Sequence, residues 1–148
     1  MSSLSDASDN ASAIRRIEAL RADVRPRWGV MNPAQMLAHC QRAHELAAGE
    51  LRLKRRLIGR LIGGWAKKRF IVGDAPFAKS SPTDPSFLVR DERDFEVEKG
   101  RLIELLRRYG EERVFTHEPH PFFGPLTPSE WDRLLSKHLD HHLRQFGV

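Results

Sequence analysis

The sequence predicts an all-α protein built as a four-helix bundle. Apolar residues recur at helical spacing in four long segments, and two of these segments begin with the same helix-capping signature. Strand-like patterns are confined to short pieces near residues 70–72 and 112–116. A Pro- and Ser-rich stretch precedes the third long helix, which predicts a long crossover between the second and third helices of the bundle.

Composition predicts one globular domain over residues 11–148. The chain has 148 residues, of which 40% are hydrophobic and 30% are charged, as in ordinary soluble proteins. Residues 1–10 are polar and acidic, so we expect a disordered tail there. The apolar runs are too short to cross a bilayer, and the single cysteine, Cys40, suits a reducing compartment. We therefore expect a cytoplasmic protein that is not a membrane protein.

The first two helices are predicted from periodicity and from capping residues. The second helix begins in the sequence MNPAQM, where Asn32 is the N-cap, Pro33 the first helical residue and Gln35 the third. It should run to Ala48 and end at Gly49. The first helix, over residues 11–24, has apolar residues at helical intervals: Ile14, Ile17, Leu20 and Val24.

Residues 52–69 form a basic segment with eight Lys and Arg residues and no Asp or Glu. Its apolar residues have a helical rhythm that Gly59, Gly63 and Gly64 weaken, which predicts one short helix. Two explanations are open. In the one we favour, the apolar side packs over the bundle and the basic side faces solvent. In the other, the segment binds nucleic acid or anionic lipid.

The last two helices are predicted from the same signals. The third helix covers residues 93–109, with Gly110 as its stop. The fourth begins in the sequence LTPSEW, where Thr127, Pro128 and Glu130 repeat the capping pattern of the second helix, and it should end at Gly147. Two sharply defined helix starts suggest that something on these two helices needs accurate placement.

Three of the seven histidines lie near the end of the fourth helix, in the sequence KHLDHH. At about 100° per residue, His138 and His142 lie about 20° to either side of Trp131, in the centre of the apolar face, and His141 lies at its edge. Buried imidazoles cost free energy unless hydrogen bonds or a metal ion satisfy their nitrogens. An i, i+4 pair is an established way to offer two metal ligands from one helix.

A metal ion needs a third protein ligand, and the second helix offers His39 and His44. Each lies about 70° from the centre of the apolar face, on opposite flanks, so periodicity does not choose between them. Cys40 faces more directly inward and would ligate zinc as a thiolate, although such a residue is more often a small buried hydrophobe. At this stage the third ligand stays open.

Two segments carry a resemblance to a known family. The sequences WGVMNPAQMLAHC and HPFFGPLTPSEWDRLLSKHLDHHLRQFG resemble the DinB-like (YfiT-like) superfamily of proposed metalloenzymes, and within it one branch of unknown function. The resemblance extends over nearly the whole chain after the tail and is weakest in the middle. It implies a four-helix bundle with up-down-down-up topology and a three-histidine metal site.

By motif, the resemblance implies His39, His138 and His142 as the metal ligands, and so selects His39 over His44. His44 is then expected at the surface or edge of the bundle, and His141 beside the site or exposed. Three neutral imidazoles suit a divalent transition metal, Zn²⁺, Ni²⁺, Fe²⁺ or Cu²⁺. They leave coordination positions open, as in a catalytic site.

The resemblance also implies an activity, that of a metal-dependent transferase or hydrolase on a small molecule. Characterised members of the superfamily include transferases and isomerases that use the thiols mycothiol or bacillithiol, so a low-molecular-weight thiol is an expected partner. His120 is our candidate acid–base residue, although a hydrogen bond that pins its loop is the simpler explanation. His117, Glu118 and Asp140 are further candidates by proximity in the sequence.

Two other classes of function compete with the enzyme. One is a non-enzymatic binding module that uses residues 52–69, and the other is a structural protein, a homodimer in which the metal only stabilises the fold. For the basic segment we do not expect nucleic acid as the partner, because packing over the bundle explains its apolar residues equally well.

Overall fold

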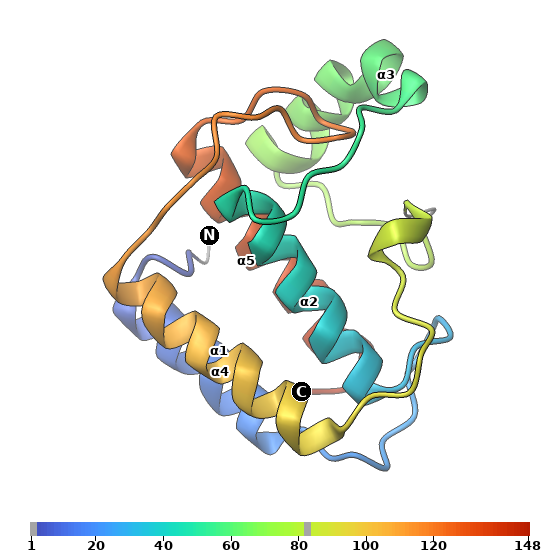
Figure 1. Ribbon diagram of the computed structural model, residues 1–148, viewed down its shortest axis with the longest axis vertical. Coiled ribbons are helices and arrows are strands. Elements are labelled where there is room, and N and C mark those ends of the chain that lie inside the picture. Colours follow the sequence, from blue (N-terminus) through green and yellow to red (C-terminus); the bar gives the residue numbers. More distant parts are fainter. Residues whose placement is uncertain (1–2, 82–83) are drawn as a thin grey trace.

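The computed structural model describes residues 3–81 and 84–148, and within them it contains five α-helices and no β-strand (Figure 1). The predicted all-α class is confirmed. The strand pieces predicted near residues 70–72 and 112–116 are wrong, because the first continues a helix and the second is irregular. The helices are α1 (Ala7–Ala19), α2 (Pro33–Ala48), α3 (Leu57–Lys67), α4 (Phe95–Glu111) and α5 (Pro128–Gln145), with a π-helical turn η1 (Lys68–Val72) and a 3-10 turn η2 (Pro85–Phe87).

Helices α1, α2, α4 and α5 enclose the hydrophobic core, whereas α3 lies apart from them at the edge of the molecule (Figure 1). Following the chain colours, α1 and α5 run in one direction and α2 and α4 in the other. The side chain of Asn10, early in α1, donates to the carbonyl of Leu106, late in α4, as antiparallel helices require. The most deeply buried core side chains come from all four helices: Ile17, Met36, Leu37, Leu102, Leu106, Trp131, Leu135, Leu139 and Leu143.

Both predicted capping boxes are present. The Asn32 side chain accepts from the Gln35 backbone N–H at 2.9 Å, and the Gln35 side chain accepts from the Asn32 N–H at 3.0 Å. Thr127 and Glu130 make the same reciprocal pair at 3.3 and 2.8 Å. Gly49 ends α2 in the left-handed conformation, at φ 79°. These caps set the residue at which α2 and α5 begin, and therefore the faces on which their histidines lie.

The N-terminal segment differs from the prediction. Helix α1 begins at Ala7, because the Asp6 side chain accepts hydrogen bonds from the N–H groups of Ser8 and Asp9 and so caps the helix. Leu4 is buried in the core, and the Ser3 hydroxyl donates to Asp132 of α5. The sequence predicted a disordered tail over residues 1–10, whereas residues 3–10 here include a buried leucine and the first turn of α1; residues 1–2 lie outside the described residues. The polar composition of this segment gave no indication that Leu4 would be buried or that Asp6 would cap a helix.

Helix α4 also differs slightly at both ends. It is capped by Asp94, whose side chain accepts from the N–H of Val97, so it begins two residues after the predicted start. It continues through Gly110 to Glu111, and Gly110 is therefore not its stop. A glycine ends a helix only where the next turn needs the left-handed conformation, and Gly110 is helical here.

The short helix predicted in the basic segment exists as α3, but its orientation is the opposite of the one we favoured. Its large apolar side chains face solvent, with Leu57, Leu61 and Trp65 being 77%, 83% and 63% exposed. The explanation in which they pack over the bundle is therefore wrong. None of the described helices, α3 included, combines the length and the hydropathy that crossing a membrane requires.

Candidate metal centre

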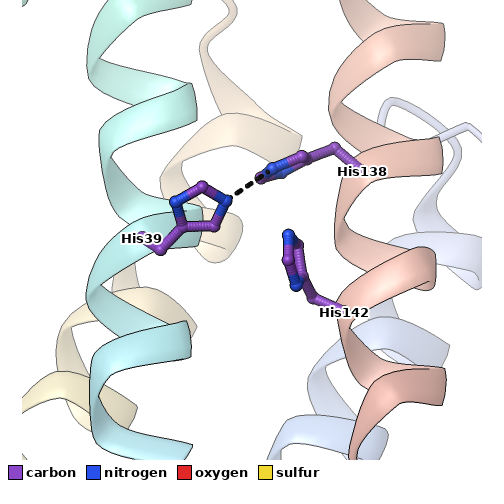
Figure 2. A group of neighbouring side chains, drawn as sticks. All are labelled: His39, His138 and His142. Atoms are coloured by element: carbon purple, nitrogen blue, oxygen red, sulfur yellow. Dashed lines mark hydrogen bonds between the residues drawn. The ribbon is translucent and has the colours of Figure 1, made fainter. Parts of the chain in front are cut away.

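Three histidines from α2 and α5 converge between these two helices (Figure 2). His39 lies in the second turn of α2, and His138 and His142 lie one turn apart on α5. The ring centroids are 4.7 to 4.9 Å apart, and one nitrogen from each ring lies within 4.8 Å of the other two. The structure thus brings together the three predicted ligands and leaves His44 outside the group.

The proton on His39 is placed by a backbone carbonyl. His39 Nδ1 lies 2.7 Å from the carbonyl oxygen of Phe87, in the 3-10 turn η2. Because a carbonyl only accepts hydrogen bonds, Nδ1 must carry the proton. In the neutral ring, Nε2 then has a free lone pair, and Nε2 is the atom that faces His138. A metal-ligating histidine is typically held this way through its other nitrogen.

His142 is held by a longer chain of the same kind. Its Nδ1 lies 2.7 Å from the side-chain oxygen of Gln145, and the Gln145 amide nitrogen donates to the carbonyl of Trp28 at 2.6 Å. The Trp28 carbonyl fixes which end of the Gln145 amide faces His142, and so places the proton on Nδ1 and the lone pair on Nε2. Gly29, at φ 80°, permits this approach, since a Cβ there would lie 2.6 Å from the Gln145 nitrogen.

His138 is the third member of the group and lies on α5, as His142 does. Its Nε2 lies 3.0 Å from Nε2 of His39 (Figure 2). In a tetrahedral site with Zn–N distances of about 2.0–2.1 Å, two ligand nitrogens lie about 3.3 Å apart, so the observed spacing is close to that of two ligands on one ion. His138 is partly exposed, whereas His39 and His142 are buried. The three nitrogens are therefore candidate ligands for one divalent ion.

Burial keeps all three imidazoles neutral. It lowers the pKa of His39, lowers that of His142 to about 3, and holds that of His138 well below its ordinary value, with further lowering from the neighbouring imidazoles. Neutral rings are the form that binds metals. Within the described part of the chain, no Asp, Glu or Cys joins the group, so a bound ion would keep its double positive charge.

Neither His141 nor Cys40 belongs to the group of three histidines. His141 is half-buried beside the group, with its ring centroid 5.2 Å from that of His142 and 5.4 Å from that of Trp28. Cys40 is buried in the core, where its sulfur lies 3.7 Å from that of Met36. Burial raises the pKa of the Cys40 thiol, so this residue packs as an apolar side chain rather than binding as a thiolate.

The expected surface position of His44 is wrong. His44 is buried, and its ring packs edge-on against Tyr109 of α4 with centroids 5.3 Å apart. Helix α4 lies along this flank of α2, and a helical wheel of α2 alone cannot show which flank a later helix will cover. Nδ1 of His44 has no hydrogen-bond partner among the described residues. Burial lowers its pKa to about 4.

His44 should make the stability of the metal-free protein depend on pH. Its pKa is 6.5 when exposed and about 4 in the fold, so between these values the unfolded chain binds a proton that the folded chain does not. The contribution of neutral His44 to the free energy of unfolding is complete above pH 6.5 and is lost as the pH falls toward 4. From pH 7 to pH 5 we expect His44 to lower the free energy of unfolding by about 2 kcal/mol.

Urea unfolding at both pH values tests this contribution. Burial also lowers the pKa of His120 and His142 to about 3. Between pH 7 and pH 5 the free energy of unfolding of the wild type will therefore fall by more than the amount that comes from His44. The informative quantity is the difference between the two proteins, and the variant His44→Leu should lose about 2 kcal/mol less than the wild type. An equal loss in both proteins would show that His44 is protonated in the folded state.

None of the acid–base candidates belongs to the group of three histidines. Nδ1 of His120 accepts from the backbone N–H groups of Phe122 and Phe123 at 3.1 and 3.2 Å, and its ring packs on Trp131 at 5.5 Å. These contacts support the simpler explanation, in which His120 pins its loop; its catalytic role stays a prediction. Among the other candidates, His117 and Glu118 are exposed, and Asp140 forms ion pairs with Arg16 and Arg144.

Sequence reasoning missed the groups that orient the ligands. The carbonyls of Phe87 and Trp28 belong to connecting segments. Every residue has a backbone carbonyl, so the sequence does not show which ones accept a hydrogen bond from a histidine. Gln145 could have been found, because it lies three residues after His142 and is therefore its neighbour on the helix surface.

Comparison with known proteins gives one match. Residues 3–147 match the sequence model of a family described as "Protein of unknown function (DUF1569)". This match covers all five helices and all three converging histidines. No curated protein and no solved structure matches the chain.

Proposed function

The chain belongs to the DUF1569 family of unknown function, and on that premise we propose that it is a metal-dependent enzyme acting on a small molecule. The observation that carries this proposal is the convergence of His39, His138 and His142, three neutral imidazoles of which two are oriented through Nδ1. A purely structural zinc site closes its fourth position with protein, whereas this group offers three ligands. We propose Zn²⁺, Ni²⁺, Fe²⁺ or Cu²⁺ as the ion.

The fold supports a finer placement of the family. We propose that DUF1569 belongs to the DinB-like superfamily, with α1, α2, α4 and α5 as its four-helix bundle of up-down-down-up topology. The segment between α2 and α4, which includes α3, would then be the crossover. In favour of this proposal, the two chain segments that resemble the superfamily contain all three converging histidines.

In this proposal each residue has a stated task. His39, His138 and His142 would hold the ion, and the carbonyl of Phe87 and the amide of Gln145 keep protons on Nδ1 of His39 and His142. Once bound, the ion would supply Lewis acidity, which lowers the pKa of a coordinated water or thiol or polarises a carbonyl. The protein keeps the rings neutral by burying them.

The charge of the site favours an anionic ligand. Three neutral donors leave the double charge of the ion uncompensated, and within the described part of the chain no carboxylate joins them. A thiolate is both anionic and a good ligand for these metals, so we propose a thiol-dependent transferase, with a hydrolase as the related alternative. Trp28, Phe77 and His141 form a cluster of rings beside His142 and would bound the substrate side.

Titration of the Co²⁺-loaded protein with a low-molecular-weight thiol tests this function. Entry of a thiol into the coordination shell changes the visible spectrum of Co²⁺, and we expect a saturable change with bacillithiol or mycothiol. The variant His141→Ala keeps the three ligands and should keep Co²⁺. A protein that binds Co²⁺ tightly, but whose spectrum responds neither to thiols nor to small anions, would instead have a structural site without an exchangeable position.

A further inference from the structure

Helix α3 presents an unusual division of its surface into three faces. Five large apolar side chains lie within an arc of about 140° and are 42% to 83% exposed. On the opposite side, Gly59, Gly63 and Ala66 are buried against the body of the protein. Arg60 and Lys67 lie on the remaining flank. The five exposed apolar residues, which we call the apolar face of α3, are Leu57, Ile58, Leu61, Ile62 and Trp65.

The glycines determine which face points outward. A Cβ on Gly63 would lie 2.1 Å from the carbonyl oxygen of Phe122, and a Cβ on Gly59 would lie 2.6 Å from the same oxygen. The backbone of α3 therefore rests directly on the loop that contains Phe122, in a contact that only glycine allows. Because the helix is seated through its smallest residues, its largest residues must face away from the protein. The exposure of the apolar face is thus specified by the sequence.

The chain segment that carries this apolar face is strongly basic. Residues 52–69 contain eight Lys and Arg residues and no Asp or Glu, and the rest of the chain carries a net charge of −3 (17 basic and 20 acidic residues). Two of the basic residues are paired with acids elsewhere, Arg56 with Asp84 and Lys67 with Glu130. The exposed basic residues of the segment are Arg52, Lys54, Arg56, Arg60, Lys68 and Arg69. A partner of this surface must therefore be apolar and anionic at once.

An anionic bilayer meets both requirements better than the other partners. A second copy related by a two-fold axis would bring the basic segment against its own like charge. Nucleic acid would satisfy the cations, but it would leave five large apolar side chains in water. A bilayer takes up protruding apolar side chains without needing a matched groove, and tryptophan at the position of Trp65 suits the headgroup region.

We propose that α3 is an interfacial anchor that inserts its apolar face into the surface of a bilayer rich in anionic lipid. The helix lies at the edge of the molecule, so it can lie flat on such a surface while the other helices remain outside it (Figure 1). The surrounding arginines and lysines contact the lipid headgroups. This inference does not rest on the metal centre, so an experiment that contradicts one of the two proposals does not affect the other.

Vesicle sedimentation with the full chain tests the anchor. We expect binding to phosphatidylcholine vesicles that contain phosphatidylserine, weaker binding to phosphatidylcholine alone, and weakening by salt. The double variant Leu61→Glu with Trp65→Glu should lose binding to both kinds of vesicle. The double variant Arg60→Gln with Lys68→Gln should lose affinity by about fivefold for each charge removed.

The control is Val30→Glu, which places one negative charge on a valine that is 93% exposed and lies outside α3. It should bind vesicles like the wild type, and all variants should keep the thermal unfolding transition of the wild type. The proposal is overturned if the Leu61/Trp65 variant still binds vesicles. It is also overturned if the wild type binds only DNA, or if it binds no vesicle and forms a dimer that the same variant makes monomeric.

Discussion

Replacing His138 with alanine is expected to lower the affinity for Zn²⁺ by more than about a hundredfold, beyond what loss of an orienting hydrogen bond typically costs. The variant removes one of three ligands and leaves two nitrogens, on His39 and His142, that are held by Phe87 and Gln145. By exposed fraction His138 is also the least buried of the three, so its truncation should disturb the core less than truncation of the other two. Competition against a chelating dye measures the affinity directly.

His141→Ala is the matched control for this variant. His141 is the next histidine along α5 and lies 5.2 Å from His142, measured between ring centroids, but it offers no nitrogen to the group. The affinity of the His141→Ala variant for Zn²⁺ should stay within a few-fold of that of the wild type. If the two alanine variants lose affinity for Zn²⁺ equally, the ion is bound by a different set of histidines.

Replacing Gln145 with leucine is expected to lower the affinity for Zn²⁺ by about 10- to 100-fold while all three ligands remain. The Gln145 oxygen accepts the proton of His142 Nδ1 at 2.7 Å, and without it His142 is free to adopt the tautomer that carries its proton on Nε2. Leucine is of similar size, so the packing of the end of α5 is largely kept. The same dye competition gives the result.

Gln41→Leu separates this effect from the general cost of removing a buried amide. Gln41 is also buried, and its amide donates to the carboxylate of Glu98 at 2.8 Å, away from the metal centre. This variant should lose stability, because it leaves Glu98 without that donor, yet it should bind Zn²⁺ like the wild type. If Gln145→Leu also binds like the wild type, the hydrogen bond to His142 does not orient a ligand.

The parts of the fold that the sequence predicted are those that depend on local chemistry. The capping boxes at Asn32 and Thr127 place two helix starts to the residue, because the groups that form them lie within four positions of each other. The i, i+4 spacing of His138 and His142 likewise holds on any regular helix. Local rules therefore predicted the two helix starts and the placement of His138 and His142 on one face of α5.

Features that depend on distant parts of the chain could not be predicted in the same way. The burial of His44 depends on α4, which begins some fifty residues later, and Asn10 and Leu4 order the N-terminal segment by contacts with the core. The outward face of α3 was predicted wrongly because an apolar stripe usually marks the buried side of a helix. Here the glycine stripe marks the buried side, since it allows the closest backbone contact.

Metal analysis of the untagged protein shows whether His39, His138 and His142 bind an ion. We expect one divalent transition-metal ion per chain in the wild type and in His141→Ala, and none in His138→Ala. We also expect the metal-free wild type to take up one equivalent of Zn²⁺, Ni²⁺, Fe²⁺ or Cu²⁺. If the wild type is purified without metal and takes up none of these ions, the protein has no metal centre, and the three converging histidines are a hydrogen-bonded part of the core.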